Sequence, residues 1–226
     1  MNDFTETTDS VLKRLYAGRE KLVAFIDESF PNRSIPARRG FYAVTAVIVR
    51  SQDLDAVRYD YAETAGFDKW HTTDRFNSGE HEKITEFCQA LADAPDPLLL
   101  VVEAGEHVVQ ENLETTRRLC LSTMVRLLHE EYGVELVIYE RRRPGVEQEN
   151  DNKTALGLRK AFPRLIIRDA WSGSEALLWA PDVLAWTMQR RLIEHESWFD
   201  PFVDVAKIYN ASGDQITGFT RIGPLK

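Results

Sequence analysis

The chain has 226 residues, of which 43% are hydrophobic and 28% charged, so it is long and apolar enough to bury one substantial core. Its net charge of −8 argues against a protein that coats nucleic acid by neutralising phosphates. An enzyme with a local basic groove and metal ions remains compatible with that charge. Apolar runs are far too short to span a membrane and the N-terminus does not resemble a signal peptide, which predicts a cytoplasmic protein.

The chain shows no internal repeat and no linker rich in Pro, Gly or Ser. We therefore expect one domain over residues 1–226, with residues 1–20 as a polar N-terminal extension and residues 196–226 as a C-terminal extension. Cys88 and Cys120 occupy apolar positions of predicted helices, where a free cysteine acts as a small hydrophobic residue. Neither a disulfide nor a thiolate metal site is indicated.

The first part of the chain predicts two strands joined by a loop. Residues 22–26 form an apolar run of strand length, and the run ends abruptly at Asp27 and Glu28. These carboxylates are therefore expected at the carboxyl end of a buried strand. Residues 41–49 are rich in β-branched and aromatic side chains and predict the second strand, while residues 31–40 predict a basic hairpin loop.

The middle of the chain alternates between helical and strand patterns. Apolar residues at spacings of three and four predict amphipathic helices over residues 80–91 and 113–128, with a strand over residues 98–102 between them. Residues 134–139 predict a further strand, which ends on Glu140 directly before three arginines. A second predicted strand thus ends on a carboxylate.

The remaining elements complete a mixed sheet with helices packed on it. We expect a loop over residues 144–152, a short helix over residues 153–160 and a short strand over residues 165–167. A dense apolar segment over residues 175–193 predicts a helix packed deeply against the sheet. Pro181 is expected to kink this helix or restart it at the following residue.

Acidic residues fall at strand ends and early in the last helix, where ligands bind in folds of this class. Mg²⁺ and Mn²⁺ require several oxygen ligands, and two such ions can activate water and stabilise a leaving oxygen in phosphoryl chemistry. Asp27, Glu140 and Asp182 can supply those oxygens. Each also has an ordinary structural explanation, because Asp27 begins an Asp-Glu-Ser turn and Glu140 can pair with the arginines that follow it.

Three motifs resemble a bacterial family catalogued as domain of unknown function 3800. They are Phe-Ile-Asp-Glu-Ser at residues 25–29, Tyr-Glu-Arg at residues 139–141 and Leu-Leu-Trp-Ala-Pro-Asp-Val-Leu-Ala at residues 177–185. The family is similar to the ribonuclease H-like (retroviral integrase) superfamily. The resemblance, which spans about residues 22–195, therefore implies an α/β fold of ribonuclease H-like type, with a mixed five-stranded sheet and helices on both faces.

The resemblance also implies a metal site. Members of that superfamily carry metal-binding acids on the first strand, the fourth strand and the last helix, which correspond to Asp27, Glu140 and Asp182. These residues would hold two Mg²⁺ or Mn²⁺ ions, with Glu28 as an outer ligand. Glu140 stands where many relatives carry Asp, and Pro181 replaces a small or apolar residue, although glutamate still ligates a cation.

Basic residues beside these acids are candidates for substrate contacts. His71, in Trp-His-Thr-Thr-Asp, resembles a histidine segment of the family and is expected either to protonate a leaving group or contact a phosphate, or else to lie in a surface loop. Arg38, Arg39, Arg141 and Arg142 suit phosphate contacts, or simply balance the carboxylates when no metal is bound.

The five tryptophans can include a platform on which nucleic-acid bases stack. They are Trp70, Trp171, Trp179, Trp186 and Trp198. Trp179 and Trp186 lie seven residues apart on the last predicted helix, so we expect them in the core.

The resemblance implies a metal-dependent nuclease that hydrolyses phosphodiester bonds in DNA or RNA. Two alternatives stay open. One is a non-catalytic module of the same fold that binds nucleic acid or protein. The other is a nucleotide phosphohydrolase, for which the low positive charge is an easier fit than for an enzyme acting on a polynucleotide.

Overall fold

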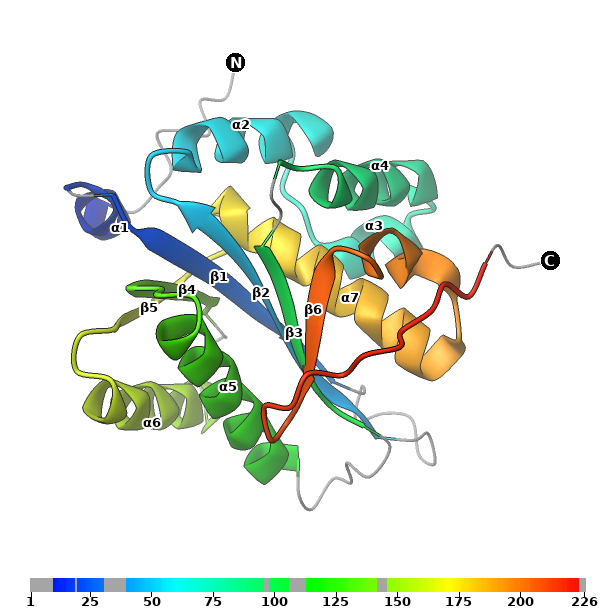
Figure 1. Cartoon of the computed structure of the whole chain (residues 1–226). Coiled ribbons are helices and arrows are strands. Elements are labelled where there is room, and N and C mark those ends of the chain that lie inside the picture. The colour runs from blue at the N-terminus through cyan, green and yellow to red at the C-terminus, as the bar shows by residue number, and fades with distance from the viewer. Residues whose placement is uncertain are drawn as a thin grey trace.

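The computed structural model describes residues 10–18, 20–30, 40–95, 98–105, 113–141 and 146–223. Its centre is a six-stranded mixed sheet with the strand order β5-β4-β1-β2-β3-β6 (Figure 1). The strands are β1 Leu22–Ser29, β2 Tyr42–Arg50, β3 Leu98–Ala104, β4 Leu136–Glu140, β5 Ile166–Ala170 and β6 Ala206–Asn210. The predicted α/β class and mixed sheet are confirmed. The prediction of five strands is wrong, because β6, from the expected C-terminal extension, pairs with β3.

Strand directions place the carboxyl ends of β1, β4 and β5 at one end of the sheet. β1 pairs antiparallel with β2, and β2 antiparallel with β3. β4 runs parallel to β1, and β5 runs parallel to β4. Every residue of β2 except Arg50 is buried, which explains why its sequence is a continuous apolar run instead of an alternating one.

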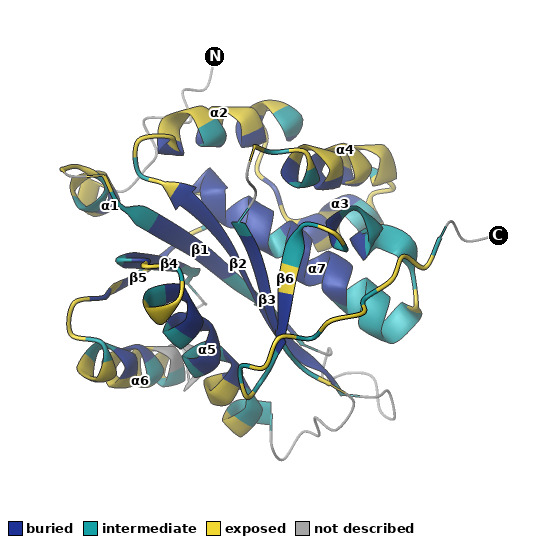
Figure 2. Cartoon of the chain, viewed as in Figure 1, coloured by how far each residue is buried: buried dark blue, intermediate teal, exposed yellow. Residues whose placement is uncertain are grey.

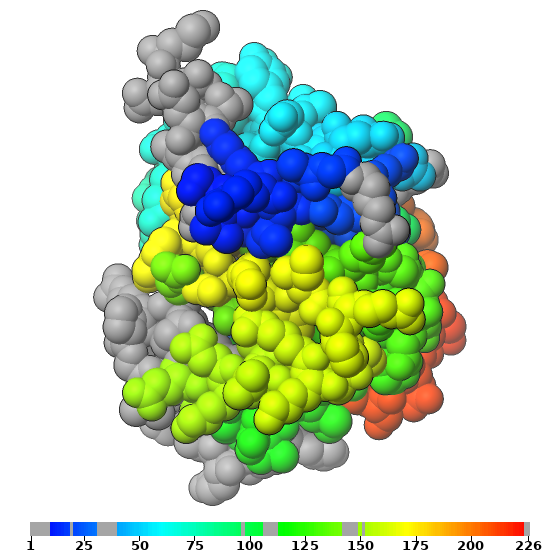
Figure 3. All heavy atoms as spheres, turned by 90° about the vertical axis from the view of Figure 1, so that its left-hand side faces the viewer, coloured from blue at the N-terminus to red at the C-terminus, as the bar shows by residue number. Residues whose placement is uncertain are grey.

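Helices cover both faces of the sheet (Figure 1). One face carries α1 Ser10–Tyr16, α2 Leu54–Thr64, α3 Thr72–Asn77, α4 His81–Ala92 and α7 Trp179–Glu194, with the 3₁₀ segments η2 Ala176–Leu178 and η3 Ser197–Phe202. The other face carries α5 Leu113–Glu130 and α6 Val146–Ala161. Figure 2 shows the buried strands between these two layers, and Figure 3 shows α1 in dark blue on one side of the sheet and α6 in yellow-green on the other. Among the described helices, none combines the length and apolar character that a membrane crossing requires.

The alternation of side chains along β1 sends its two acids to opposite faces of the sheet. Phe25 lies in the core beneath α7, whereas Ile26 lies in the core beneath α5. Asp27 continues the series of Phe25, and Glu28 continues that of Ile26. The two carboxylates therefore face different helical layers.

Two of the expected helices differ in the structure. α6 begins at Val146, so much of the loop predicted over residues 144–152 is helical. The first turns of α6 are polar, and a polar helix carries no apolar periodicity that would reveal it. The last helix changes from 3₁₀ to α at Trp179 and then runs unbroken to Glu194, so the expected restart after Pro181 is wrong. Pro181 lies in the first turn of α7, where its missing N–H breaks no helical hydrogen bond.

Candidate active site

A cavity of about 850 Å³ opens where β1 and β4 end. Its polar part is lined by Asp27, Lys69, His71, Glu140 and Ser172. Its apolar part continues between the sheet and the layer of α5 and α6, against Leu121, Val125, Val137, Leu158 and Ile167. The cavity therefore joins a cluster of ionisable groups to an apolar chamber, as ligand sites commonly do.

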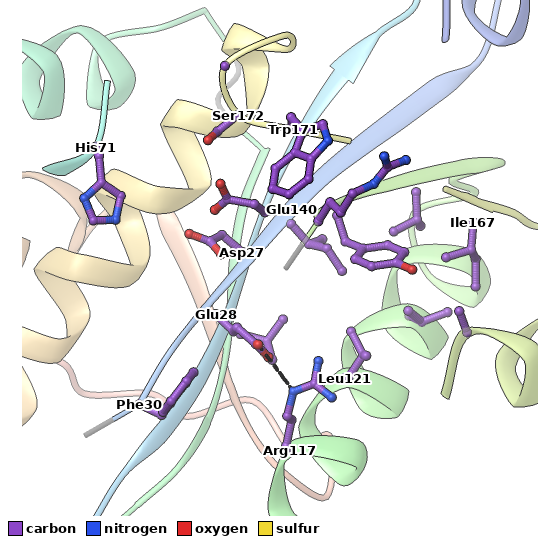
Figure 4. A pocket seen from close by; sticks show the side chains of 18 of the residues that line it. Asp27, Glu28, Phe30, His71, Arg117, Leu121, Glu140, Ile167, Trp171 and Ser172 are labelled. Carbon is purple, nitrogen blue, oxygen red and sulfur yellow. Dashed lines mark hydrogen bonds and ion pairs between the residues drawn. The ribbon is translucent and has the colours of Figure 1, made fainter. Parts of the chain in front are cut away.

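Asp27 and Glu140 come together through strand register. Ile26 pairs with Tyr139 in the parallel ladder of β1 and β4, so the next residues of the two strands, Asp27 and Glu140, lie side by side. Figure 4 shows both carboxylates directed to the same side, toward His71. Local strand pairing is thus sufficient to bring together two of the predicted site residues.

Asp182 is held in the first turn of α7 by hydrogen bonds from α3. The backbone N–H and the hydroxyl of Thr72 both donate to its Oδ2, over 2.8 and 2.7 Å. The Thr72 hydroxyl in turn accepts a bond of 2.9 Å from the indole N–H of Trp70. Thr45 in β2 donates to the carbonyl of Pro181 over 2.8 Å, which attaches the start of the helix to the sheet opposite Asp27.

The three carboxyl groups influence one another electrostatically. Burial raises the pKa of Asp27 well above its usual range, and the negative charges of Glu140 and Asp182 raise it further. Burial likewise raises the pKa of Glu140 and of Asp182. A hydrogen bond from Ser172 and the charge of His71 oppose the rise at Glu140, and His71 also opposes it at Asp182. The cluster therefore lies together in an environment that disfavours several negative charges at once.

Glu28 lies on the opposite face of the sheet, among partners of its own. Its carboxylate accepts hydrogen bonds from the Arg117 Nε of α5, over 2.9 Å, and from the Tyr42 hydroxyl of β2. The Phe30 ring stacks on Tyr42 with ring centroids 6.0 Å apart. In Figure 4, Glu28 points toward Arg117 and away from Asp27. Its role as an outer metal ligand stays a prediction.

His71 faces the acids from the residue that precedes α3. Its backbone is extended, and its Nδ1 lies 3.3 Å from Oδ2 of Asp74. The side chain lines the cavity and is 49% exposed, so it can reach both solvent and ligand. Lys69, two residues earlier, also lines the cavity, and its charge opposes the rise in the pKa of Glu140.

Only one of the four arginines predicted to contact substrate lies within the described residues. Arg141 lines the cavity, makes an ion pair with Asp169, and places its guanidinium 5.5 Å from the ring centroid of Trp171. Arg38, Arg39 and Arg142 lie outside the described residues.

For several residues at the site, no pattern in the sequence indicates a functional position. Thr72 and Lys69 flank the predicted His71, but nothing in that segment shows that it meets α7. Ser172 lies in a short polar loop without periodicity, although it directly follows Trp171. Arg117 occupies an amphipathic helix, in which a charged residue is normally assigned to the solvent face.

The carboxylates do not form a preassembled metal site. Within the described part of the chain, no group of three or more His, Cys, Asp or Glu side chains is arranged so that it could hold a metal ion. A cation would therefore have to draw the side chains of the three acids closer together.

Comparisons with known proteins add no relative. No protein-family model matches the chain, and a search of curated proteins finds no match. The resemblance to the bacterial family therefore rests on the three sequence motifs and the segment around His71 alone.

Proposed function

We propose that the protein is a divalent-metal-dependent nuclease that hydrolyses phosphodiester bonds at the cavity beside Asp27, Glu140 and Asp182. The main support for the proposal is that these three carboxylates lie together on one face at the end of the sheet. They come from β1, β4 and α7. The first strand, the fourth strand and the last described α-helix are also where the resemblance to ribonuclease H-like proteins expects metal-binding acids.

The donor chemistry of the cluster fits Mg²⁺ or Mn²⁺. Carboxylate oxygens are the ligands these hard cations prefer, and a cation would relieve the repulsion that, in addition to burial, raises the pKa of Asp27. Side-chain rotation at Asp27 and Glu140 would have to complete the ligand set, because no three-residue group in the described regions is arranged to hold a metal as it stands. The ions would supply an activated water and neutralise charge on the phosphate.

The surrounding residues have distinct tasks in this proposal. Thr72 fixes the Oδ2 atom of Asp182, so that one carboxylate keeps its orientation. His71, oriented by Asp74, is placed to donate a proton to the leaving oxygen. Lys69 and Arg141 line the same cavity and would bind the substrate phosphate.

A nucleotide phosphohydrolase is the second candidate, because the cavity continues into an apolar chamber. Leu121, Val125 and Ile167 line that part, which is suited to enclosing the base of a small substrate. The net charge of −8 also suits a small substrate better than a long polyanion. Comparing the hydrolysis of nucleotides with that of oligonucleotides separates the two candidates.

The test replaces Asp27 with Asn and measures cleavage of labelled single- and double-stranded DNA and RNA in Mg²⁺ or Mn²⁺. Wild type should cleave at least one of these substrates, and Asp27→Asn should be slower by about a hundredfold or more, since it removes the charge of one of the three carboxylates that would hold the ions. Asp60→Asn is the matched control, because Asp60 is exposed on α2 and does not line the cavity. The proposal fails if wild type neither binds Mn²⁺ by calorimetry nor cleaves any of these substrates.

A further inference from the structure

Trp171 differs from the other tryptophans in its exposure. Its residue surface is 43% exposed, whereas Trp70 and Trp179 are each 1% exposed and Trp186 is 6% exposed. Trp198 is partly buried and packs edge-on against Trp186, with ring centroids 5.4 Å apart. Packing in the core explains why the chain has these four tryptophans. It does not explain Trp171, which lies in the wall of the cavity.

Arg141 lies against one face of the Trp171 ring. Its guanidinium lies over the indole, 5.5 Å from the ring centroid, and an ion pair with Asp169 orients it. A guanidinium in this position gains cation–π attraction and still carries N–H groups that can contact a phosphate. The cavity wall thus combines a partly exposed aromatic ring with a positive charge.

The loop that carries Trp171 is fixed relative to the acids. The Trp171 carbonyl accepts hydrogen bonds from the backbone N–H groups of Ser174 and Glu175, over 2.8 and 3.0 Å, which close a tight turn. The indole N–H of Trp179 in α7 donates to the carbonyl of Ser172 in this turn over 2.8 Å, and Ser172 lines the cavity together with Glu140. Figure 4 shows Trp171 and Ser172 beside Glu140. A ligand on the indole would therefore lie next to the carboxylate cluster.

We propose that Trp171, with Arg141 over its ring, is a platform on which an unpaired base of single-stranded DNA or RNA stacks while the neighbouring phosphate faces Asp27 and Glu140. This inference rests on the proposed function and adds the class of substrate. Bases inside a duplex are stacked on one another and cannot reach the ring, so the platform selects unpaired strands. Stacking also gives an acidic chain affinity for nucleic acid that requires few phosphate contacts.

The experiment measures binding of a short labelled oligonucleotide by fluorescence anisotropy in EDTA, where metal-dependent cleavage cannot occur. DNA and RNA are each compared with an abasic oligomer of equal length and charge. Wild type should bind the base-containing oligomers about 5- to 150-fold more tightly than the abasic one. Trp171→Ala should lose this preference, and Trp171→Phe should keep part of it. Tyr59→Ala is the control, since Tyr59 is 53% exposed and does not line the cavity.

A second readout uses tryptophan emission. Base-containing oligomers should quench the emission of wild type, and Trp171→Phe should remove that quenching. The platform is rejected if wild type binds abasic and base-containing oligomers equally, if it binds neither, or if Trp171→Ala binds like wild type. A protein that cleaves nucleic acid without base preference would overturn the platform alone. Base preference in a protein that never cleaves would overturn the nuclease proposal alone.

Discussion

Thr72 connects two parts of the candidate site through a single hydroxyl. The side chain is fully buried, accepts a hydrogen bond from Trp70 and donates one to Asp182. Thr72→Val keeps the shape of the side chain and removes both bonds. We expect it to lower the free energy of unfolding by about 1–3 kcal/mol, because it leaves a buried indole N–H without an acceptor. Urea denaturation measures this loss.

Thr72→Ser is the matched control, because it keeps the hydroxyl and removes only a methyl group. It should cost about 1 kcal/mol or less, the order expected for one buried methyl group. A stability close to wild type in the Val variant, beside a clear loss in the Ser variant, would show that the methyl group, and not the hydrogen bonds, stabilises this position.

Individual site residues differ in how far the sequence could predict them. Asp27 and Glu140 each follow an apolar run of strand length, so their place at the strand ends can be predicted from local pattern. The opposite orientation of Glu28 also follows from side-chain alternation, once the strand is seen to continue to Ser29. The bond from Thr72 to Asp182 joins residues 110 apart, and no local pattern encodes such a contact.

At the scale of elements, a buried ion pair joins α2 to the start of the last helix. Arg58 donates from Nε and Nη2 to the two carboxylate oxygens of Glu175, over 3.0 and 3.2 Å. The hydroxyl of Tyr16 in α1 donates to the same carboxylate over 2.8 Å, and Glu175 also caps η2 through the N–H of Leu177. One carboxylate thus connects α1, α2 and η2.

Glu175→Ala should lower the free energy of unfolding by about 3–5 kcal/mol, because it leaves the Nε and Nη2 groups of the buried Arg58 unpaired and only the exposed Asp55 as a partner. Asp204→Ala breaks the exposed pair between Asp204 and Arg221 and should cost about 1 kcal/mol or less. Chemical denaturation of both variants provides the comparison. If both variants lost a similar small amount of unfolding free energy, the buried Glu175 pair would be no more important for stability than the exposed pair.

The elements that were predicted and those that were missed differ in their local signal. β1, β2, β3, α4 and α5 have strong apolar patterns, and the structure places all of them within a few residues of the predicted bounds. β6 has five residues, of which only Ile208 and Tyr209 are buried, and it becomes a strand by pairing with β3. α2 buries Arg58 through an ion pair, so its inner face includes a residue that the sequence assigns to solvent.

At the scale of the whole molecule, the sheet gathers negative charge in a chain that is already acidic. Asp27, Glu140 and Asp182 come from segments that are far apart in sequence, and the parallel pairing of β1 with β4 and the packing of α7 unite them. Their meeting could be predicted only through the resemblance, because periodicity alone does not define strand order. Bringing the three carboxylates together should destabilise the folded protein when they are ionised, so its stability should depend on pH.

In EDTA, we expect the stability of wild type to fall as pH rises above about 4. The pKa of each of the three carboxyl groups is raised above its ordinary value, which is 3.8 for Asp27 and Asp182 and 4.5 for Glu140. The folded protein therefore binds more protons than the unfolded chain between the ordinary and the raised pKa, and folding loses stability as these protons dissociate. Asp27→Asn should flatten this decline and melt at a higher temperature than wild type at pH 8.

Mn²⁺ should reverse the decline, because it competes with protons for the same oxygens. At a concentration of about 100 times its dissociation constant, a bound ion adds about 2.7 kcal/mol, which corresponds to a rise in Tm of about 5–10 °C for a chain of this length. The rise should be large at pH 8, small at pH 5 and absent in Asp27→Asn, while Asp60→Asn should follow wild type. Calorimetric melts with and without Mn²⁺ measure it. Equal rises at the two pH values, or an undiminished rise in Asp27→Asn, would show that Mn²⁺ binds away from the three carboxylates.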